Sequence, residues 1–351
     1  MIRPIPLVLA AHLLLLLGRA QPDGPAALGK PLSFNLGRLV FRPSGFFENI
    51  AEYRSLTTPD TVYTRFGAIP LGKSPGQWLD SLRHSRISLH VDTRLGSGTL
   101  AGYIEIDFQN PPGQQPCQFR QYWGEFSQGR WRILAGQAWS LLRPNRAGTS
   151  SETDLMNTQA VDPAYHVGLM GLRKRQVRIT RLMGAWQAVL AYEYMKGGDV
   201  LLKVARDTAR AHFETVAMAG HARRLGFSLA AVVHAGARLD FVSQQFWSQG
   251  VGYDALKTMP PGVHAHATIQ GAEIKVRKGL GLFSYGGIVY GTRSQGNRVV
   301  REWSVGARQQ LLKAVFLSAQ YSQLDRSLWN GSTGAMNFLM LSFRYVVPSA
   351  R

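Results

Sequence analysis

Cysteine is almost absent from the sequence: Cys117 is the single cysteine among 351 residues. One thiol excludes an intrachain disulfide framework and any zinc site built from cysteines. After the N-terminal region no apolar run approaches the roughly 20 residues that a membrane-spanning helix needs. The sequence also lacks a Gly-x-Ser-x-Gly nucleophile elbow, and His264 and His266 have no third ligand nearby in the sequence. We therefore expect no enzyme active site, no metal and no cofactor.

Acidic residues are scarce. The chain has 21 Asp and Glu against 40 Lys and Arg, a formal charge of +19. This excess favours an anionic partner: nucleic acid, a phospholipid or lipopolysaccharide surface, or small acidic solutes. Glycine (37 residues) and aromatic residues (8 Trp, 12 Tyr and 16 Phe) are frequent. That composition is unusual for a nucleic-acid-binding protein and typical of a barrel with aromatic girdles.

Residues 1–20 have the pattern of a secretory signal peptide. Arg3 supplies a short positive region, and a mostly apolar stretch covers residues 5–17. Gly18 and Ala20 place small residues three and one positions before a cut near residue 21. The apolar stretch is too short for a membrane anchor. The pattern predicts export from the cytoplasm, which argues against a nucleic-acid partner.

From about residue 84 onward, apolar and polar residues alternate in segments of 8–12 residues. In residues 86–94, for example, Ile87, Leu89 and Val91 alternate with Arg86, Ser88, His90, Asp92 and Arg94. Strands with lipid on one side and water on the other need this period of two. A soluble β-sandwich gives the same alternation, because it too buries one face of each sheet. Connection lengths are needed to separate the two folds.

Sixteen strands are predicted, an even number, as a closed bacterial barrel requires. Their ranges are 36–54, 84–94, 99–109, 118–127, 130–139, 175–183, 185–195, 200–207, 210–220, 225–235, 238–249, 264–276, 279–291, 298–309, 313–325 and 335–347. Every second connection is tight, whereas most of the others are longer, although 196–199, 221–224 and 292–297 are short. The sequence thus predicts an all-β fold: a closed antiparallel transmembrane β-barrel of about 16 strands.

The predicted domains are a signal peptide (1–20), a flexible segment (21–35) and the barrel (36–347). The longest connection within the barrel, residues 140–174, follows the fifth strand and is the third outer loop. Unstructured loops of this length are usually functional or disordered. We expect this loop to fold inward and narrow the channel, as plugging loops do in large barrels. The alternative is a surface lid with solvated charges.

Residues 84–345 resemble the DcaP-like family of trimeric outer-membrane porins. The resemblance is carried by 85–93, 102–108, 120–126 and the segment Leu-Ala-Gly-Gln-Ala-Trp-Ser at 134–140, followed by a long loop and 175–179. It implies a sixteen-stranded trimer that passes small anionic solutes, dicarboxylates among them. Two features depart from the family. The 21–35 stretch is too short for the periplasmic helical extension of some members, and the chain ends in Pro348-Ser349-Ala350-Arg351 instead of an aromatic residue.

Charged residues on the water-facing side of the strands and in the third outer loop are the candidate site. Arginine is always protonated and offers a planar fork of donors that matches carboxylate and phosphate. A set of arginines at a narrow point would raise the local concentration of anions. Any one of them could instead be a rim residue or part of a salt bridge. The candidates for lining the channel are Arg86, Arg94, Arg132, Arg143, Arg146, Glu152, Asp154, Asp162, Arg178, Arg308 and Arg344.

The predicted function is an outer-membrane porin that lets small hydrophilic solutes diffuse passively and favours anions such as dicarboxylates. The expected partners are small anionic solutes, outer-membrane lipid and lipopolysaccharide, and two further copies in a homotrimer. Two alternatives remain open at this point. One is a non-conducting barrel with a structural or lipopolysaccharide-contacting role, and the other is an outer-membrane hydrolase, for which the sequence contains no motif.

Overall fold

The computed structural model describes residues 32–58, 66–109, 115–152, 155–194, 197–252, 258–259, 262–292 and 296–347. The predicted signal peptide, most of the predicted flexible segment and Asp154 lie outside these residues. Within them no helix is long and apolar enough to cross a membrane.

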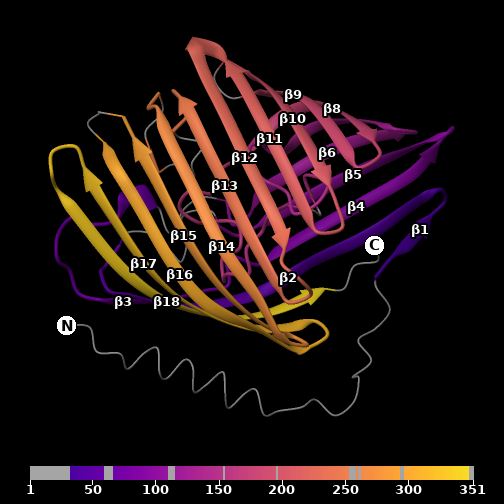
Figure 1. The fold of residues 1–351 in the computed structure, drawn as a ribbon. Coiled ribbons are helices and arrows are strands. Elements are labelled where there is room, and N and C mark those ends of the chain that lie inside the picture. The colour runs from indigo at the N-terminus through magenta and orange to yellow at the C-terminus, as the bar shows by residue number, and fades with distance from the viewer. Residues whose placement is uncertain are drawn as a thin grey trace.

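Sixteen long antiparallel strands form a closed barrel (Figure 1). They are β2 (Leu39–Arg54), β4 (Arg86–Leu95), β5 (Gly98–Asp107), β6 (Gln118–Gln128), β7 (Trp131–Trp139), β8 (Arg173–Met183), β9 (Trp186–Tyr194), β10 (Asp199–Asp207), β11 (Ala211–Gly220), β12 (Arg224–His234), β13 (Leu239–Gln249), β14 (Ala265–Arg277), β15 (Leu280–Gly291), β16 (Asn297–Leu312), β17 (Val315–Leu328) and β18 (Thr333–Val347). Each pairs with its neighbours in the chain, and β18 pairs with β2 to close the ring. The predicted fold class and strand count are confirmed.

Two short strands were not predicted. β1 (Phe34–Leu36) forms a hairpin with the start of β2, and its first two residues are the last two of the predicted flexible segment. β3 (Gln77–Ser81) pairs with the second half of β2, whose first half pairs with β4. The loop predicted over 55–83 therefore contains a short strand of the barrel wall, β3, and the 3-10 turn η1 (Phe66–Ala68). The second 3-10 turn, η2 (His221–Arg223), joins β11 to β12.

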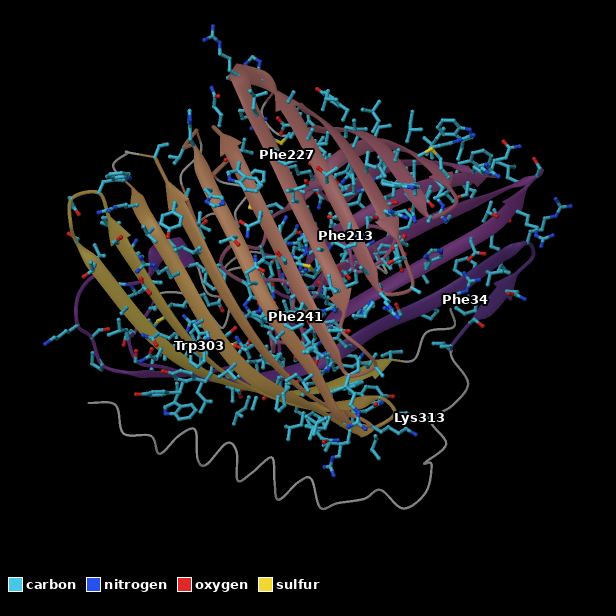
Figure 2. All side chains as sticks on the ribbon, viewed as in Figure 1. Phe34, Phe213, Phe227, Phe241, Trp303 and Lys313 are labelled. Carbon is cyan, nitrogen blue, oxygen red and sulfur yellow. The ribbon has the colours of Figure 1, made fainter. Side chains whose placement is uncertain are left out.

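Side-chain alternation sorts the wall into an outer and an inner surface. Large apolar residues such as Phe213, Phe227, Phe241 and Trp303 project from the outer surface (Figure 2), and each is more than 40% exposed. Their chain neighbours Glu214, Ser228, Asp240 and Glu302 point to the inner side and are buried. Outside a lipid bilayer, so much exposed apolar wall would be unfavourable.

The two ends of the barrel differ in the length of their connections. Seven tight turns, beginning with residues 96–97 and 129–130, lie at the end where β2 starts and β18 stops. Glycines with positive φ, such as Gly129 (φ +58°) and Gly184 (φ +66°), occupy several of these turns, where a side chain would be strained. The long connections, 55–85 and 140–172 among them, leave the opposite end. Outer-membrane barrels place the tight turns on the periplasmic side.

Candidate functional site in the barrel interior

The third outer loop, L3 (residues 140–172), lies against the inner wall. Its backbone amides donate hydrogen bonds to inward-pointing carboxylates and amides of five different strands. The pairs are Leu141 N to Glu193 Oε1 (2.7 Å), Asn145 N to Glu214 Oε2 (3.1 Å), Met170 N to Gln244 Oε1 (2.9 Å), Val167 N to Glu302 Oε2 (2.8 Å) and Val161 N to Gln320 Oε1 (2.9 Å). These bonds satisfy a loop backbone that is shielded from bulk water.

An apolar cluster lies between L3 and the wall. Leu142, Met156, Val167 and Met170 of the loop are fully buried. They belong to one cluster with inward-facing wall residues of β9 to β15, namely Val189, Leu201, Val216, Val232, Val242, Phe246, Ile269 and Val289. Strict alternation predicts water-facing side chains at these inner positions. The structure differs because L3 covers this part of the wall and excludes water from it.

Two glycines allow L3 to approach the wall closely. A Cβ atom built on Gly287 of β15 would lie 1.8 Å from the carbonyl oxygen of Val167. A Cβ atom on Gly168 of the loop would lie 1.8 Å from the carbonyl oxygen of Thr268, and Gly168 has a φ of +85°. Any larger residue at either position would push the loop backbone away from β14 and β15.

Charged side chains also hold L3 in place, through contacts with the wall and within the loop. Lys203 Nζ of β10 donates to the carbonyl oxygen of Arg143 (3.0 Å) and to Asn145 Oδ1 (2.9 Å), and forms an ion pair with Glu214 (3.1 Å). Arg143, a predicted channel-lining residue, donates to the carbonyl oxygen of Ala164 (2.8 Å) and is 1% exposed, so it holds the loop together. Arg146, also predicted, pairs with Glu273 of β14.

Three of the predicted residues surround one hollow. Arg132 of β7, Arg178 of β8 and Glu152 of L3 line a polar space of about 160 Å³, together with His90 and Glu125. Glu152 Oε2 lies 3.3 Å from His90 Nδ1 of β4, so L3 reaches across to this side of the barrel. Arg178 is buried and donates to Gln176 Oε1 (2.9 Å) and to the carbonyl oxygen of Trp139 (2.8 Å). Arg132 is half-buried and faces the hollow.

A second group of arginines lies at the outer end, between L3 and strands β4 to β8. It consists of Arg86, Arg120, Arg143 and Arg173, whose charges interact with Tyr165 of L3. Arg120 donates to Glu105 Oε1 (2.8 Å) and to Asp107. Asp162, another predicted residue, acts electrostatically on Arg86 and Arg143. Burial opposes ionisation of the Tyr165 hydroxyl, but Arg173, Arg120 and Arg86 outweigh it, and the pKa of Tyr165 falls below its ordinary value.

Each guanidinium of this group has a buried nitrogen without a hydrogen-bond partner in the described part of the chain. The atoms are Arg86 Nε, Arg120 Nη2, Arg143 Nε and Arg173 Nη1. Arg86 lies over the Phe46 ring at 5.2 Å, and Arg143 and Arg173 lie over the Trp139 ring at 5.0 and 5.4 Å. Leaving a buried donor unsatisfied costs about 1–3 kcal/mol, more for a charged group. The group is therefore suited to receive an anion.

The remaining predicted residues lie elsewhere on the wall. Arg344 of β18 pairs with Glu48 of β2 (2.8 Å) and donates to the carbonyl oxygen of Val161 in L3 (3.3 Å). Arg308 of β16 lies over the Phe316 ring at 4.3 Å. Arg94, near the end of β4, is exposed and far along the strand from the other candidates. Asp154 lies outside the described residues.

Sequence reasoning did not assign a role to Arg120, Arg173 or Tyr165. The pairing of β5 with β6 slips next to Arg120: Glu105 faces Gln121, whereas Ile106 faces Phe119. This bulge brings Arg120 to the inner side, and simple alternation through β6 does not reveal it. Arg173 falls within the range predicted for the third outer loop (140–174), but it is the first residue of β8. Tyr165 has no sequence signal beyond its place in that loop.

Comparison with known proteins supports the fold. No protein-family model and no curated protein matches the chain. Among solved structures, the outer-membrane channel DcaP of Acinetobacter baumannii aligns with a TM-score of 0.73 and 15% identity, over 89% of this chain and 99% of that one. An anion-selective porin from Comamonas acidovorans aligns with a TM-score of 0.61 and 12% identity, over 88% and 99%.

In vitro-folded OmpT, an outer-membrane protein of Vibrio cholerae, aligns with a TM-score of 0.62 and 9% identity, over 90% and 99% of the two chains. All three alignments span nearly the whole of the other protein, so the correspondence covers a complete barrel. Their low identity restricts the correspondence to the fold. The resemblance to the DcaP-like porins is thereby confirmed at the level of the fold, which this chain shares with outer-membrane channels.

Proposed function

We propose that this protein is an outer-membrane porin through which small hydrophilic solutes diffuse, with a preference for anions such as dicarboxylates. One observation carries the proposal: positive charge is left over inside the barrel. Among the arginines at inner or rim positions, some form neither an ion pair nor a side-chain hydrogen bond within the described residues; they include Arg86, Arg94, Arg132, Arg173 and Arg308. The carboxylates of the inner wall are mostly paired with arginine or lysine, including Glu48, Asp92, Glu105, Asp107, Glu193, Glu214 and Glu273.

The surplus charge acts on solutes because L3 narrows the space around it. Arg86 and Arg173 lie beside L3 at the outer end, and Arg132 faces the tip of L3 at Glu152. In a narrow, poorly screened passage, unpaired guanidiniums raise the local concentration of anions and lower that of cations. One of the structural relatives, the porin from Comamonas acidovorans, is anion-selective. No catalytic step is part of this proposal.

Reversal potentials in planar bilayers under a salt gradient test the proposal. The wild-type protein should give the sign of an anion-favouring channel. Replacing both Arg86 and Arg173 by glutamine should move the potential toward zero, because two unpaired positive charges are lost. Arg175→Gln is the matched control, since Arg175 lies on the same strand as Arg173 but is exposed near Tyr122 of the outer surface. A cation-favouring wild-type potential would refute the anion preference.

The export route, location and assembly belong to the same proposal. Residues 1–20 are removed during export, the barrel resides in the outer membrane, and three copies associate. A trimer form exists for OmpT of Vibrio cholerae. Mass spectrometry of the exported protein should find an N-terminus near residue 21, and chemical cross-linking of the folded protein should give trimers and no larger species.

A non-conducting barrel is the second candidate. It is favoured by the extent of L3, which packs on β9 to β17 and also reaches β4 through Glu152. Such a loop could close the barrel to solutes. Single-channel current steps from the purified wild-type protein would exclude this candidate, whereas their absence in a correctly folded sample would support it.

A further inference from the structure

The end of the barrel with the tight turns carries charge of one sign. Five of its seven turns contain an arginine or lysine, and none contains an aspartate or glutamate. The five residues are Arg130, Arg210, Arg238, Lys278 and Lys313. Exposed apolar residues such as Leu95, Trp131 and Trp186 stand directly beside these turns, so in a bilayer the turns would lie at the level of the lipid headgroups. A ring of cations at that level attracts anionic headgroups.

Two arginines on the outer surface strengthen this pattern. The Cζ atom of Arg181 on β8 lies 4.5 Å from the ring centroid of Trp131, and that of Arg206 on β10 lies 5.1 Å from the Trp186 ring. Both tryptophans are nearly half exposed and begin their strands at the tight-turn end. Tryptophans at this height mark the boundary between headgroups and acyl chains. Neither arginine forms an ion pair with any described residue.

A groove on the outer surface begins beside Arg206. It has a volume of about 450 Å³ and extends from Trp186 at the start of β9 across strands β10 to β13. Its larger lining residues are Trp186, Phe213 and Leu229, each more than 40% exposed, and the smaller Thr215, Ala231 and Ser243 lie among them. Because small residues alternate with large ones, the wall is hollowed there. An apolar chain about as wide as an acyl chain would bury the sides of the groove.

We propose that this site binds one anionic phospholipid of the periplasmic leaflet. The phosphate lies at Arg206 and at Arg210 in the turn after β10, and one acyl chain follows the groove past Thr215 and Ala231. A guanidinium recognises phosphate through paired hydrogen bonds, and no carboxylate in this turn competes for it. Lipopolysaccharide is the wrong occupant, because it belongs to the opposite leaflet. The inference rests on the proposed outer-membrane location but not on solute conduction.

Native mass spectrometry of the folded protein in detergent tests the headgroup. Phosphatidylglycerol and phosphatidylcholine with the same dioleoyl chains are the probes. We expect preferential retention of phosphatidylglycerol, by about fivefold for each arginine that contacts the headgroup. The double variant Arg206→Gln, Arg210→Gln should lose the preference. Arg175→Gln, which removes an outward arginine from the opposite end of β8, should keep it. Equal retention of both lipids by the wild type, or an unchanged preference in the double variant, overturns the proposal.

A second variant tests the groove. Ala231→Phe fills it without touching either arginine, so retention of dioleoyl-phosphatidylglycerol should fall severalfold. Binding of the short-chain dihexanoyl lipid should change much less. If retention of the long-chain lipid is unaffected, the acyl chain does not occupy the groove and that part of the proposal is wrong. Channel conductance is measured on the same samples, so a failure of lipid binding is distinguished from a failure of the porin proposal.

Discussion

Lys203 illustrates how single residues inside the barrel differ from those on its rim. Its side chain is 1% exposed, and its ammonium group contacts Glu214, Asn145 and the carbonyl oxygen of Arg143. A buried charge is tolerated only when its partners replace water. The same partners hold the first part of L3, so this lysine serves the position of the loop and not the attraction of solutes. Lys313, in an exposed tight turn, has no such partners among the described residues.

Replacing Lys203 by methionine should therefore destabilise the folded barrel strongly. Glu214 would keep a buried charge with His212 and the Asn145 amide as its remaining partners. Breaking a buried pair from one side costs about 3–5 kcal/mol. Urea unfolding of the protein in lipid vesicles measures the loss. Lys313→Met is the control and should change the unfolding free energy by less than about 0.5 kcal/mol. Equal stability of the two variants would contradict the role given to Lys203.

Among elements, L3 and the strands beneath it decide the shape of the interior. The loop backbone lies directly on β14 and β15 because Gly168 and Gly287 have no side chains there. Hydrogen bonds to Glu302 and Gln244 fix the same stretch from either side. Since L3 and the opposite wall bound the passage together, a small displacement of the loop changes the width of the channel.

Gly287→Ala should move L3 and change the single-channel conductance. The new methyl group would meet the Val167 carbonyl oxygen, so the loop must shift, at a cost of about 1–3 kcal/mol in stability. Gly286→Ala is a close control. Gly286 precedes Gly287 on β15, is exposed on the outer surface, and a Cβ atom there meets nothing within 4 Å. Conductance histograms in planar bilayers should change for the first variant and match wild type for the second. Identical histograms for all three proteins would show that L3 does not set the conductance.

For the whole molecule, closure and charge are the properties that matter. The pairing of β18 with β2 removes both free edges of the sheet, which is required of a β-structure in lipid. The net charge of +19 becomes +17 when Arg3 and Arg19 leave with residues 1–20, and this excess creates a field that attracts anions toward both mouths of the barrel.

Salt should weaken the anion preference. The Debye length falls from about 10 Å at 0.1 M to about 3 Å at 1 M, so charges on the rims are screened first. Reversal potentials for a fixed concentration ratio should therefore shrink as the mean salt concentration rises. If the preference is independent of salt, the rim charges do not contribute to it, and only groups that touch the solute, such as Arg86 and Arg173, select for anions.

Closure has its own test. Unboiled protein should migrate differently from boiled protein on a detergent gel, because a closed barrel stays folded in cold detergent. Leu341→Pro should abolish the difference. Leu341 lies opposite Ala51 in the pairing that closes the ring. Because Ser55 N donates to the carbonyl oxygen of Asn337, every second residue from Asn337 onward, Leu341 included, exchanges hydrogen bonds with β2, and proline removes a backbone donor from this pairing. A folded, fast-migrating Leu341→Pro protein would mean that closure does not depend on this pairing.

The amino-acid sequence by itself determined the strands, their order and the side each residue faces. Alternation is a local property, and each pair of neighbouring strands is joined by a turn that the sequence marks, so the ranges predicted for the sixteen long strands agree with the structure to within a few residues. The bulge at Arg120 and the short strands β1 and β3 were missed. Each depends on a register or a pairing that has no periodic signal.

Only the tertiary structure decided what the inner charges do. From the sequence, Arg132, Arg143, Arg146 and Arg178 looked equivalent, but Arg143 holds L3 together, Arg146 is paired with Glu273, and Arg178 is tied to Trp139, while Arg132 is left without an ion-pair partner in the described residues. The apolar contacts between L3 and the inner wall of β9 to β15 could not be predicted from the sequence either. Such contacts join residues between 21 positions apart (Arg143 and Ala164) and 127 positions apart (Arg146 and Glu273), and the local pattern of either segment does not indicate its partner.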